Sequence, residues 1–459
     1  MAISTRPPSG MRDFMPEELA HRKFVATTIA QVYEKYGFVQ IETPSIENLS
    51  TLLGKYGDEG DQLLFRILHR RDKLARALES DQVEEKDLGD LGLRYDLTVP
   101  LARVIANYPD LPRFFKRYQI QPVWRADRPG KGRFREFLQC DVDITGTKSL
   151  IAEAEVCSAV AEVFCQLGFT NFKIHLNHRQ LLKCLIKAAG IEIEKEGTTL
   201  VAVDKLDKIE VAGVKKELNE RGIEDQQVDK LLGLIIRPEN LNEKQELERL
   251  RNLLKEIPEA AAFIDELLSL TGLLDQTAAA GHYCIDASLA RGLGYYTGPI
   301  FEIRSPEFSG SIGGGGRYDG LIGMFKGKDL PAVGFSIGFE RLVLILEERG
   351  LLNKKIAGPD LMLCHFDDVA DPEVVAAAKA FRDHGIKTEI YPETPKLGKQ
   401  ISYAESVGAR WVAILGAAEA ASRQISIKNL ASGEQQVLGW HEAAHFIAGK
   451  TLPEAVNSK

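Results

Sequence analysis

Polar and apolar side chains alternate along two runs on either side of residue 130, as in a pair of β-strands. The polar positions of one parity are Gln119, Gln121 and Arg125 in the first run and Gln139, Asp141 and Asp143 in the second. The other parity is apolar or aromatic, with Tyr118, Ile120, Trp124, Cys140, Val142 and Ile144. Because successive side chains of a strand point to opposite faces, we expect both apolar faces to pack inward and both polar faces to line one cavity.

The same patterning predicts the other elements of the first two thirds of the chain. Helical spacing of apolar residues predicts helices from Pro16 and from about Ser149 to Leu167. A short strand, a turn with Asp96 and Thr98 and a helix are expected over 91–109. Further strand-like runs lie at 38–43, 282–288, 291–303, 310–321 and 332–346, the last continuing into an amphipathic helix.

Changes of pattern along the chain suggest its domains. Residues 1–346 form the first predicted domain, which contains a mostly helical and highly charged insertion at about 172–278. Gly350 and a Gly-Pro-Asp turn mark a linker over 347–360. Alternating strand and helix signals over 361–459 then predict an independent α/β domain.

Length and composition are those of an ordinary globular protein. The chain has 459 residues, of which 44% are hydrophobic and 27% charged, and a length of this order fits two or three domains. No apolar run is long enough to cross a bilayer, and the first residues do not resemble a signal peptide. The six cysteines are scattered without paired spacing, so we expect reduced thiols and a cytoplasmic protein without a membrane partner.

Charge is distributed unevenly around the two alternating runs. Eight basic residues and one acid, Asp127, lie between Arg113 and Arg135, although the whole chain has a net charge of -8. Like charge at this density destabilises a compact structure unless an anion faces it. We therefore expect a phosphate-binding hairpin, with a solvated hairpin carrying a basic tip as the alternative.

Several familiar motifs do not fit their usual spacing. The glycines of GLGYYTG and GGGGRYDG do not match the dinucleotide pattern, and PKLGKQ lacks the upstream glycine and the Ser/Thr of a phosphate loop. His441 and His445 match the zinc motif H-E-x-x-H, but the only acid after them, Glu454, has no framework to return it to a metal. We therefore expect a terminal surface helix there and no metal site made by the protein alone.

Two further segments carry candidate chemistry. The run Gly314, Gly315 and Gly316 before Arg317 suggests close approach of backbone to a flat ligand, with a glycine-rich turn as the alternative. Arg291, Tyr295 and Tyr296 lie on a loop between expected strands. There a guanidinium can stabilise developing phosphoryl charge, and a tyrosine hydroxyl can orient a polar substrate.

Taken together, these segments resemble the histidyl-tRNA synthetases, a class II aminoacyl-tRNA synthetase family, over nearly the whole chain. YGFVQIETP resembles motif 1, the segment FKRYQIQPVWRADRPGKGRFREFLQCDVD resembles motif 2, and GFSIGFERL resembles motif 3. RGLGYYTG, GGGGRYDGL and the DLT at 96–98 are similar to histidine-specific signatures, from which Gly294 and Gly313 depart. The resemblance implies an α+β fold: an antiparallel catalytic sheet flanked by helices, a helical insertion and a C-terminal α/β anticodon-binding domain.

The resemblance also implies roles for individual residues. Those implied for ATP, which would bind with Mg²⁺, are Arg125, Arg133, Gly314, Gly315 and Arg341. Those implied for histidine are Asp96, Thr98, Arg125, Gln139, Asp143, Arg291, Tyr295 and Tyr296. Asp96, Thr98 and Gln139 would hold the ammonium group, and Asp143 with the two tyrosines would bind the imidazole edges. Arg125 on the α-phosphate and Arg291 at the transition state would be the catalytic residues.

The activity implied is that of a histidine–tRNA ligase, which forms histidyl-adenylate from L-histidine and ATP and transfers histidine to tRNA(His). The family works as a homodimer through motif 1, and the insertion would touch the acceptor arm. The alternative is a non-catalytic paralogue that senses histidine or regulates another enzyme. Such proteins typically lose catalytic arginines or the anticodon domain, whereas this chain keeps Arg125, Arg291 and Arg341.

Overall fold

The computed structural model describes residues 4–55, 57–79, 82–290, 295–352 and 358–451. The chain divides into two compact units, Met1–Leu352 and Asn353–Lys459, each of which is described by itself.

An eight-stranded sheet forms the centre of the first unit, in the order β1-β5-β6-β11-β10-β9-β7-β8. Its strands are β1 (Val39–Gln40), β5 (Phe115–Trp124), β6 (Glu136–Thr145), β7 (Lys173–His178), β8 (Tyr283–Ile285), β9 (Pro299–Ser305), β10 (Phe308–Arg317) and β11 (Ala332–Gly338). All central pairs are antiparallel, whereas the edge strands β1 and β8 pair parallel with β5 and β7. The prediction of an antiparallel core sheet with flanking helices is confirmed, with parallel pairs added at both edges.

The pairing of β5 with β6 confirms the alternation expected from the sequence. Opposite one another on the polar face lie Arg117 and Asp143, Gln119 and Asp141, and Gln121 and Gln139. Tyr118 and Val142 face each other on the apolar side and belong to the main hydrophobic core. The hairpin therefore directs one polar face toward a single side of the sheet.

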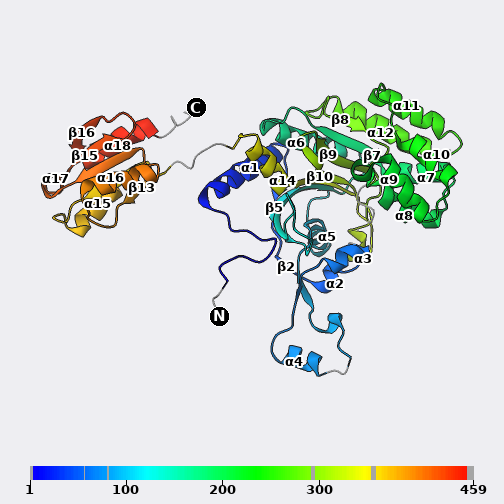
Figure 1. The fold of residues 1–459 in the computed structure, drawn as a ribbon, viewed down its shortest axis with the longest axis horizontal. Helices are drawn as coiled ribbons and strands as arrows, with labels where there is room; N and C mark the ends of the chain where they lie inside the picture. Colours follow the sequence, from blue (N-terminus) through cyan, green and yellow to red (C-terminus); the bar gives the residue numbers. More distant parts are fainter. Residues whose placement is uncertain (1–3, 56, 80–81, 291–294, 353–357, 452–459) are drawn as a thin grey trace. The chain divides into compact units, whose positions relative to one another are not determined.

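Helices α1 (Pro16–Lys35), α6 (Ile151–Gln166) and α14 (Phe339–Glu348) cover the apolar face, and α5 (Thr98–Asn107) lies on the other (Figure 1). Pro16 at the first position of α1 suits a helix start, because its missing N–H has no partner there anyway. The chain leaves this helix through Gly37, whose φ of 79° glycine adopts without a side-chain clash. Val25 and Ile29 of α1 are fully buried, as the helical spacing predicts.

The segment expected to form a mostly helical insertion starts with a strand and continues as helices. Its helices are α7 (Arg179–Ala188), α8 (Glu196–Val203), α9 (Leu206–Glu220), α10 (Asp225–Ile235), α11 (Glu243–Leu253) and α12 (Ala260–Leu274), with the 3₁₀ turn η2 (Ile193–Lys195). Residues 173–178 instead form β7 within the main sheet, where Ile174 and Leu176 are buried between β8 and β9. Within the segment 172–278, the helical part therefore starts at Arg179.

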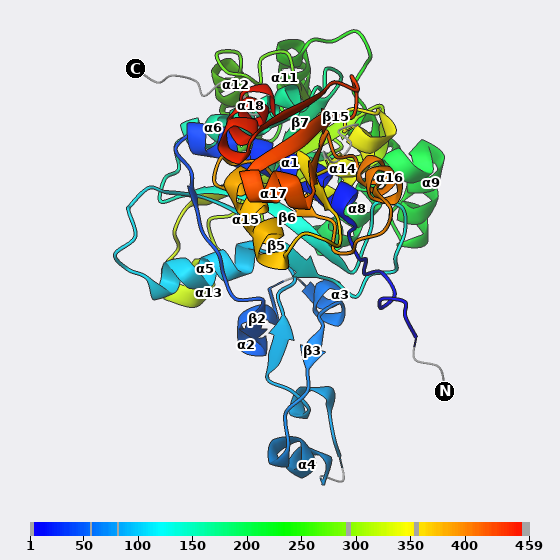
Figure 2. The ribbon, with the colours of Figure 1, turned by 90° about the vertical axis from the view of Figure 1, so that its left-hand side faces the viewer.

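Residues 46–93 form a small three-stranded sheet and an arm. Within this segment the sequence pattern predicts an element only from residue 91 onward. The sheet contains β2 (Ile46–Asn48), β3 (Arg66–Ile67) and β4 (Leu91–Leu93) in the order β2-β4-β3. The helical pieces are α2 (Leu49–Leu52), α3 (Gly57–Gln62), α4 (Asp72–Leu78) and η1 (Glu85–Asp87), and α13 (Gly323–Lys326) lies later in the chain. Figure 2 shows the arm with α4 at its end, extending away from the main sheet.

The second unit has its own sheet, in the order β13-β12-β14-β15-β16. Its strands are β12 (Leu361–His365), β13 (Thr388–Ile390), β14 (Trp411–Leu415), β15 (Gln424–Asn429) and β16 (Gln435–Gly439). Its helices are α15 (Asp371–Arg382), α16 (Leu397–Ser406), α17 (Ala417–Ser422) and α18 (Trp440–Thr451). Two hydrophobic clusters form within this unit, so it has a core of its own. None of the helices in the described ranges of the chain has the length and apolarity needed to cross a bilayer.

Candidate active site

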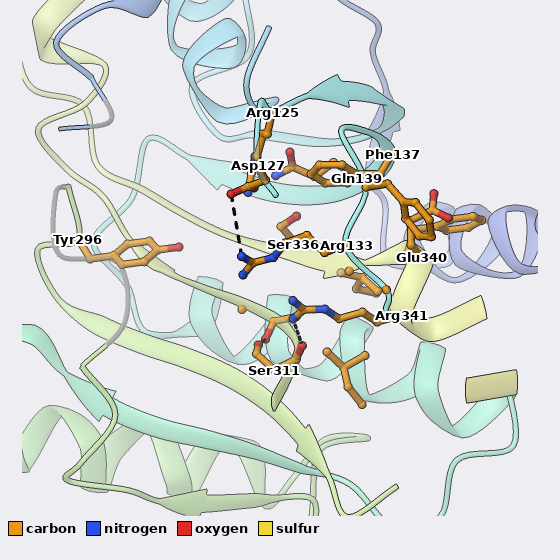
Figure 3. Close-up of a pocket in the computed structure, with 18 of the residues that line it drawn as sticks. Arg125, Asp127, Arg133, Phe137, Gln139, Tyr296, Ser311, Ser336, Glu340 and Arg341 are labelled. Atoms are coloured by element: carbon orange, nitrogen blue, oxygen red, sulfur yellow. Dashed lines mark hydrogen bonds and ion pairs between the residues drawn. The ribbon is translucent and has the colours of Figure 1, made fainter. Parts of the chain in front are cut away.

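A cavity of about 370 Å³ lies on the polar side of the main sheet (Figure 3). Its walls come from the β5–β6 hairpin, from β10 and β11, from the start of α14 and from the loop with Tyr295 and Tyr296. The charged and polar side chains that line it are Arg125, Asp127, Arg133, Gln139, Tyr295, Tyr296, Ser311, Ser336, Glu340 and Arg341. Segments that are far apart in the sequence thus meet around one space.

Three arginines face this cavity from different parts of the chain. Arg125 follows β5; its Nε donates to the carbonyl oxygen of Tyr95 at 3.0 Å, and its guanidinium carbon lies 4.4 Å from the Tyr95 ring centroid. Arg341, in the first turn of α14, donates from Nη1 to the Ser311 carbonyl. Figure 3 shows Arg133 and Arg341 extending into the cavity, with Tyr296 pointing into it from the facing side.

The charge around the cavity favours an anion. Of the two acids that line it, Asp127 lies 4.0 Å from Arg133, between Oδ1 and Nη1. The other acid, Glu340, is already paired with Arg12 and Arg22, which lie outside the lining. Three guanidinium groups therefore face a space with little opposing charge, an arrangement that suits phosphate oxygens.

Only some of the basic residues of the hairpin line the large cavity. Of its eight basic residues, only Arg125 and Arg133 line the large cavity. Arg117 is fully buried and pairs with Asp143, and Lys116 pairs with Glu155. The expectation that the whole charge cluster faces phosphate was therefore too broad, because carboxylates of the protein itself neutralise several of these cations.

A smaller cavity of about 40 Å³ adjoins the first, and the two share Gln139, Tyr295, Tyr296, Gly314 and Ser336 as lining residues. The small cavity is otherwise lined by Thr98, Asp141, Asp143, Tyr318, Gly334 and Phe335. The rings of Tyr295 and Tyr296 lie 4.7 Å apart between centroids. This cavity thus combines aromatic walls with two carboxyl groups.

Asp143 is tightly held at the back of the small cavity. Its Oδ2 lies 2.7 Å from Arg117 Nη2, and its Oδ1 accepts a hydrogen bond from the Tyr318 hydroxyl. Burial raises the pKa of Asp143, and Arg117 opposes that rise. Gly334 faces it from β11, where a Cβ would lie 1.9 Å from the carboxylate oxygen, so only glycine leaves room for this side chain.

Asp141 is a site residue that the resemblance does not name. It is 2% exposed, lines the small cavity, and its Oδ1 has no hydrogen-bond partner among the described residues. Burial raises the pKa of Asp141 to about 7, against the lowering effect of Arg117. The alternation in the sequence contained the signal for this residue, since Asp141 shares the parity of Gln139 and Asp143.

The other residues expected to bind histidine do not all line the small cavity. Thr98 and Gln139 line the small cavity, whereas Asp96 lines neither cavity and accepts a hydrogen bond from the Val99 N–H at 3.1 Å. This bond satisfies one of the free N–H groups at the start of α5. Arg291 and Gly294 lie outside the described residues.

The glycine run is largely explained by packing of the sheet. Gly314 lines both cavities, but Gly315 lines neither, and a Cβ on Gly315 would lie 2.0 Å from the carbonyl oxygen of Gly334. Gly313 and Gly316 are similarly crowded by the backbone of the neighbouring strands. Arg317 points away to Glu153, with which it forms a buried ion pair of 2.5 Å. Of the run Gly314 to Gly316, close approach of a ligand thus remains an explanation for Gly314, and Gly313 before it also lines the large cavity.

The sequence HEAAH lies in α18 of the second unit. Its His441 ring is 5.7 Å from that of His384, between centroids. Within the part of the chain that the structure describes, no group of three or more His, Cys, Asp or Glu side chains is placed to hold a metal ion.

Comparisons with known proteins agree over nearly the whole chain. The sequence profile of the histidyl-tRNA synthetase family matches residues 10–342, and that of the anticodon-binding domain matches residues 353–450. The histidine–tRNA ligase of Christiangramia forsetii is 41% identical, with 96% of this chain and 98% of that protein covered. The same enzyme of Gloeobacter violaceus is 40% identical, with 96% and 98% covered.

Solved structures give the same result. The histidyl-tRNA synthetase of Nostoc sp. PCC 7120 is 32% identical and superposes with a TM-score of 0.79, covering 98% of this chain and all of the other. A Bacillus halodurans protein described as an ATP phosphoribosyltransferase regulatory subunit/histidyl-tRNA synthetase has a TM-score of 0.72 over 91% of this chain and 99% of its own. At 21% identity that likeness concerns the fold alone. From the profile over residues 10–342 and relatives at about 40% identity, the chain belongs to the histidyl-tRNA synthetase family.

Proposed function

We propose that this chain activates L-histidine with ATP to form histidyl-adenylate and then transfers histidine to the 3′ end of tRNA(His). The observation that carries this proposal is the junction of two cavities with opposite chemistry: one faces three arginines, and the other contains two buried carboxyl groups. A triphosphate fits the first, and a small substrate with several N–H donors fits the second. The wall that the two cavities share at Gln139 and Tyr296 supports an arrangement in which the two substrates would lie end to end.

The large cavity fits ATP. Arg125 would bind the α-phosphate, Arg341 the γ-phosphate end, and Arg133 would assist from the loop. Mg²⁺ would bind the phosphate oxygens of ATP and neutralise the remaining phosphate charge. Among the described residues, no group of three or more Asp, Glu, His or Cys side chains is placed to hold the ion without ATP.

The small cavity is the proposed histidine site. Thr98 and Gln139 would orient the ammonium group, and the hydroxyls of Tyr295 and Tyr296 would reach the polar edges of the ring. The substrate carboxylate would then attack the α-phosphorus in line, so that the protein supplies position and charge without a nucleophile of its own. Arg291 remains the predicted transition-state residue.

The second unit would bind the anticodon stem, because its sequence matches the anticodon-binding domain. We further propose that the protein is a cytoplasmic homodimer paired through motif 1. The alternative of a regulatory paralogue without catalysis is disfavoured, because Arg125 and Arg341 both line the cavity and the anticodon-binding domain is present.

Histidine-dependent exchange of pyrophosphate into ATP tests the proposal directly. The purified chain, assayed with Mg²⁺ and each standard amino acid in turn, should exchange with histidine alone. Charging of tRNA(His) should follow under the same conditions. Exchange with a different amino acid, or none from protein that unfolds cooperatively, would disprove the proposed function.

A further inference from the structure

At the small cavity, two buried carboxyl groups face one guanidinium group. Arg117 is fully buried and lies between two buried carboxylates, with Nη2 2.7 Å from Asp143 Oδ2 and 3.9 Å from Asp141 Oδ2. The Tyr318 hydroxyl adds a second partner for Asp143 only. One guanidinium thus serves two carboxylates and is much closer to one of them.

Asp141 has only weak partners by comparison. Its Oδ2 accepts from Gln139 Nε2 at 3.4 Å, while its Oδ1 is buried and has no hydrogen-bond partner among the described residues. Arg117 and a hydrogen bond from the Ser336 hydroxyl, which lies opposite Asp141 across β6 and β11, oppose the rise in the pKa of Asp141. A buried oxygen without a partner costs on the order of 1–3 kcal/mol, so its presence requires an explanation.

The position of Asp141 indicates what such a partner would be. Asp141 lines only the small cavity, one step deeper along β6 than Gln139, which lines both. A space of about 40 Å³ exceeds the roughly 10–15 Å³ that one water requires. Its walls include the rings of Tyr295, Tyr296 and Tyr318, which give the space an aromatic side next to the carboxyl groups.

We propose that Asp141 is a further specificity-determining residue, whose Oδ1 accepts a hydrogen bond from a ring N–H of the histidine substrate. The proposal rests on the function proposed above and adds Asp141 to the residues that the family resemblance implies. Asp143, held by Arg117 and Tyr318, forms the back wall beside it. A substrate without a ring N–H leaves Asp141 unpaired and is rejected for that reason.

The test compares Asp141→Asn and Asp141→Ser with the full-length parent protein. Histidine-dependent exchange gives kcat and KM, and calorimetry with histidinol gives affinity for a ligand that contains the ring but no carboxylate to activate. Loss of a charge-assisted hydrogen bond should raise the KM for histidine and the Kd for histidinol about 10- to 100-fold. The KM for ATP should stay within about twofold, because a carboxylate in the small cavity does not reach the phosphates.

Asp360→Asn is the matched control, because Asp360 is also buried but lies in the second unit and accepts from the Lys387 N–H. It should leave both histidine constants unchanged. If folded Asp141 variants keep the parent KM and Kd while the parent is active, the inference is wrong and the proposed function stands. Failure of both Asp141 variants to fold would equally overturn it, since the carboxylate would then serve the fold. A parent without histidine-dependent exchange refutes the function itself.

Discussion

Arg22 and Glu340, separated by 318 positions in the sequence, form a buried ion pair through two hydrogen bonds of 2.6 and 2.7 Å. Both side chains are nearly inaccessible, at 7% and 5% exposure. Glu340 also accepts from the Leu138 N–H at 3.2 Å and pairs with Arg12. The pair therefore ties α1 to the helix start that presents Arg341 and to the hairpin strand beside it.

Replacing Arg22 with Met should destabilise the protein by about 3 kcal/mol, because it leaves a buried carboxylate with only the partly exposed Arg12 as a cation. Urea unfolding of the variant and the parent measures this loss. The exposed pair Lys216–Glu220 provides the control, and Lys216→Met should cost less than about 0.5 kcal/mol. Equal losses for both substitutions would show that burial does not set the strength of the Arg22 pair.

Replacing Arg341 with Met should weaken ATP binding about 10- to 100-fold, because the cavity loses one of its three guanidinium groups. The KM for ATP in pyrophosphate exchange measures the effect. Arg349→Met is the comparison, since Arg349 follows the same helix but pairs with Glu307 and lines no part of this cavity. An unchanged KM for the Arg341 variant contradicts its role at the phosphates.

Replacing Gly315 with Ala should lower stability by about 3 kcal/mol, the upper end of typical overpacking costs, because the new Cβ meets the Gly334 carbonyl oxygen at 2.0 Å. Thermal unfolding detects the change. A Cβ added at Gly320 would meet no atom of a non-neighbouring residue within 4 Å, so Gly320→Ala should be close to neutral. A stable Gly315 variant would mean that β10 and β11 separate readily.

The Asp141–Asp143 pair should make stability depend on pH. Burial raises the pKa of Asp141 to about 7, whereas an unfolded aspartate titrates near about 3.9. Between these values the folded chain holds more protons, so this group's contribution to the free energy of unfolding falls as pH rises. Asp141→Asn removes that contribution, and its stability relative to the parent should increase from pH 4 to pH 7. Urea unfolding across this range checks the sign, and a relative stability that decreases would reverse it.

A chain ending at Leu352 should retain histidine-dependent exchange and lose most charging of tRNA(His). Every expected contact with ATP and histidine lies before that residue, and the match to the anticodon-binding domain begins at residue 353. Both activities are measured on the truncated protein, with its oligomeric state determined by sedimentation. A parallel loss of exchange and charging while the oligomer persists would show that the second unit also supports the chemistry.

Much of the fold was accessible from the sequence, because strand and helix periodicities are local. The parity of Gln139, Asp141 and Asp143 is set by the pleat of one strand, so their common face was predictable before any pairing was known. The arm between 66 and 90 was not, since its short elements contain too few periodic positions. Residues 173–178 fall at the start of the segment predicted as a mostly helical insertion, and only their pairing with β8 and β9 shows that they belong to the main sheet.

By itself the sequence determined the family, and it indicated part of the lining of the two cavities, including Arg125, Gln139 and Tyr296. Only the tertiary structure decided which charged side chains pair with one another and which face a ligand. Arg117, part of the cluster expected to face phosphate, neutralises Asp143, and Gly315, which the resemblance implies for ATP, faces the backbone of β11. Glu340 is held by Arg22. The physical reason is that ion pairing and close packing depend on distances between segments far apart in the chain, and alternation along one segment contains no information about those distances.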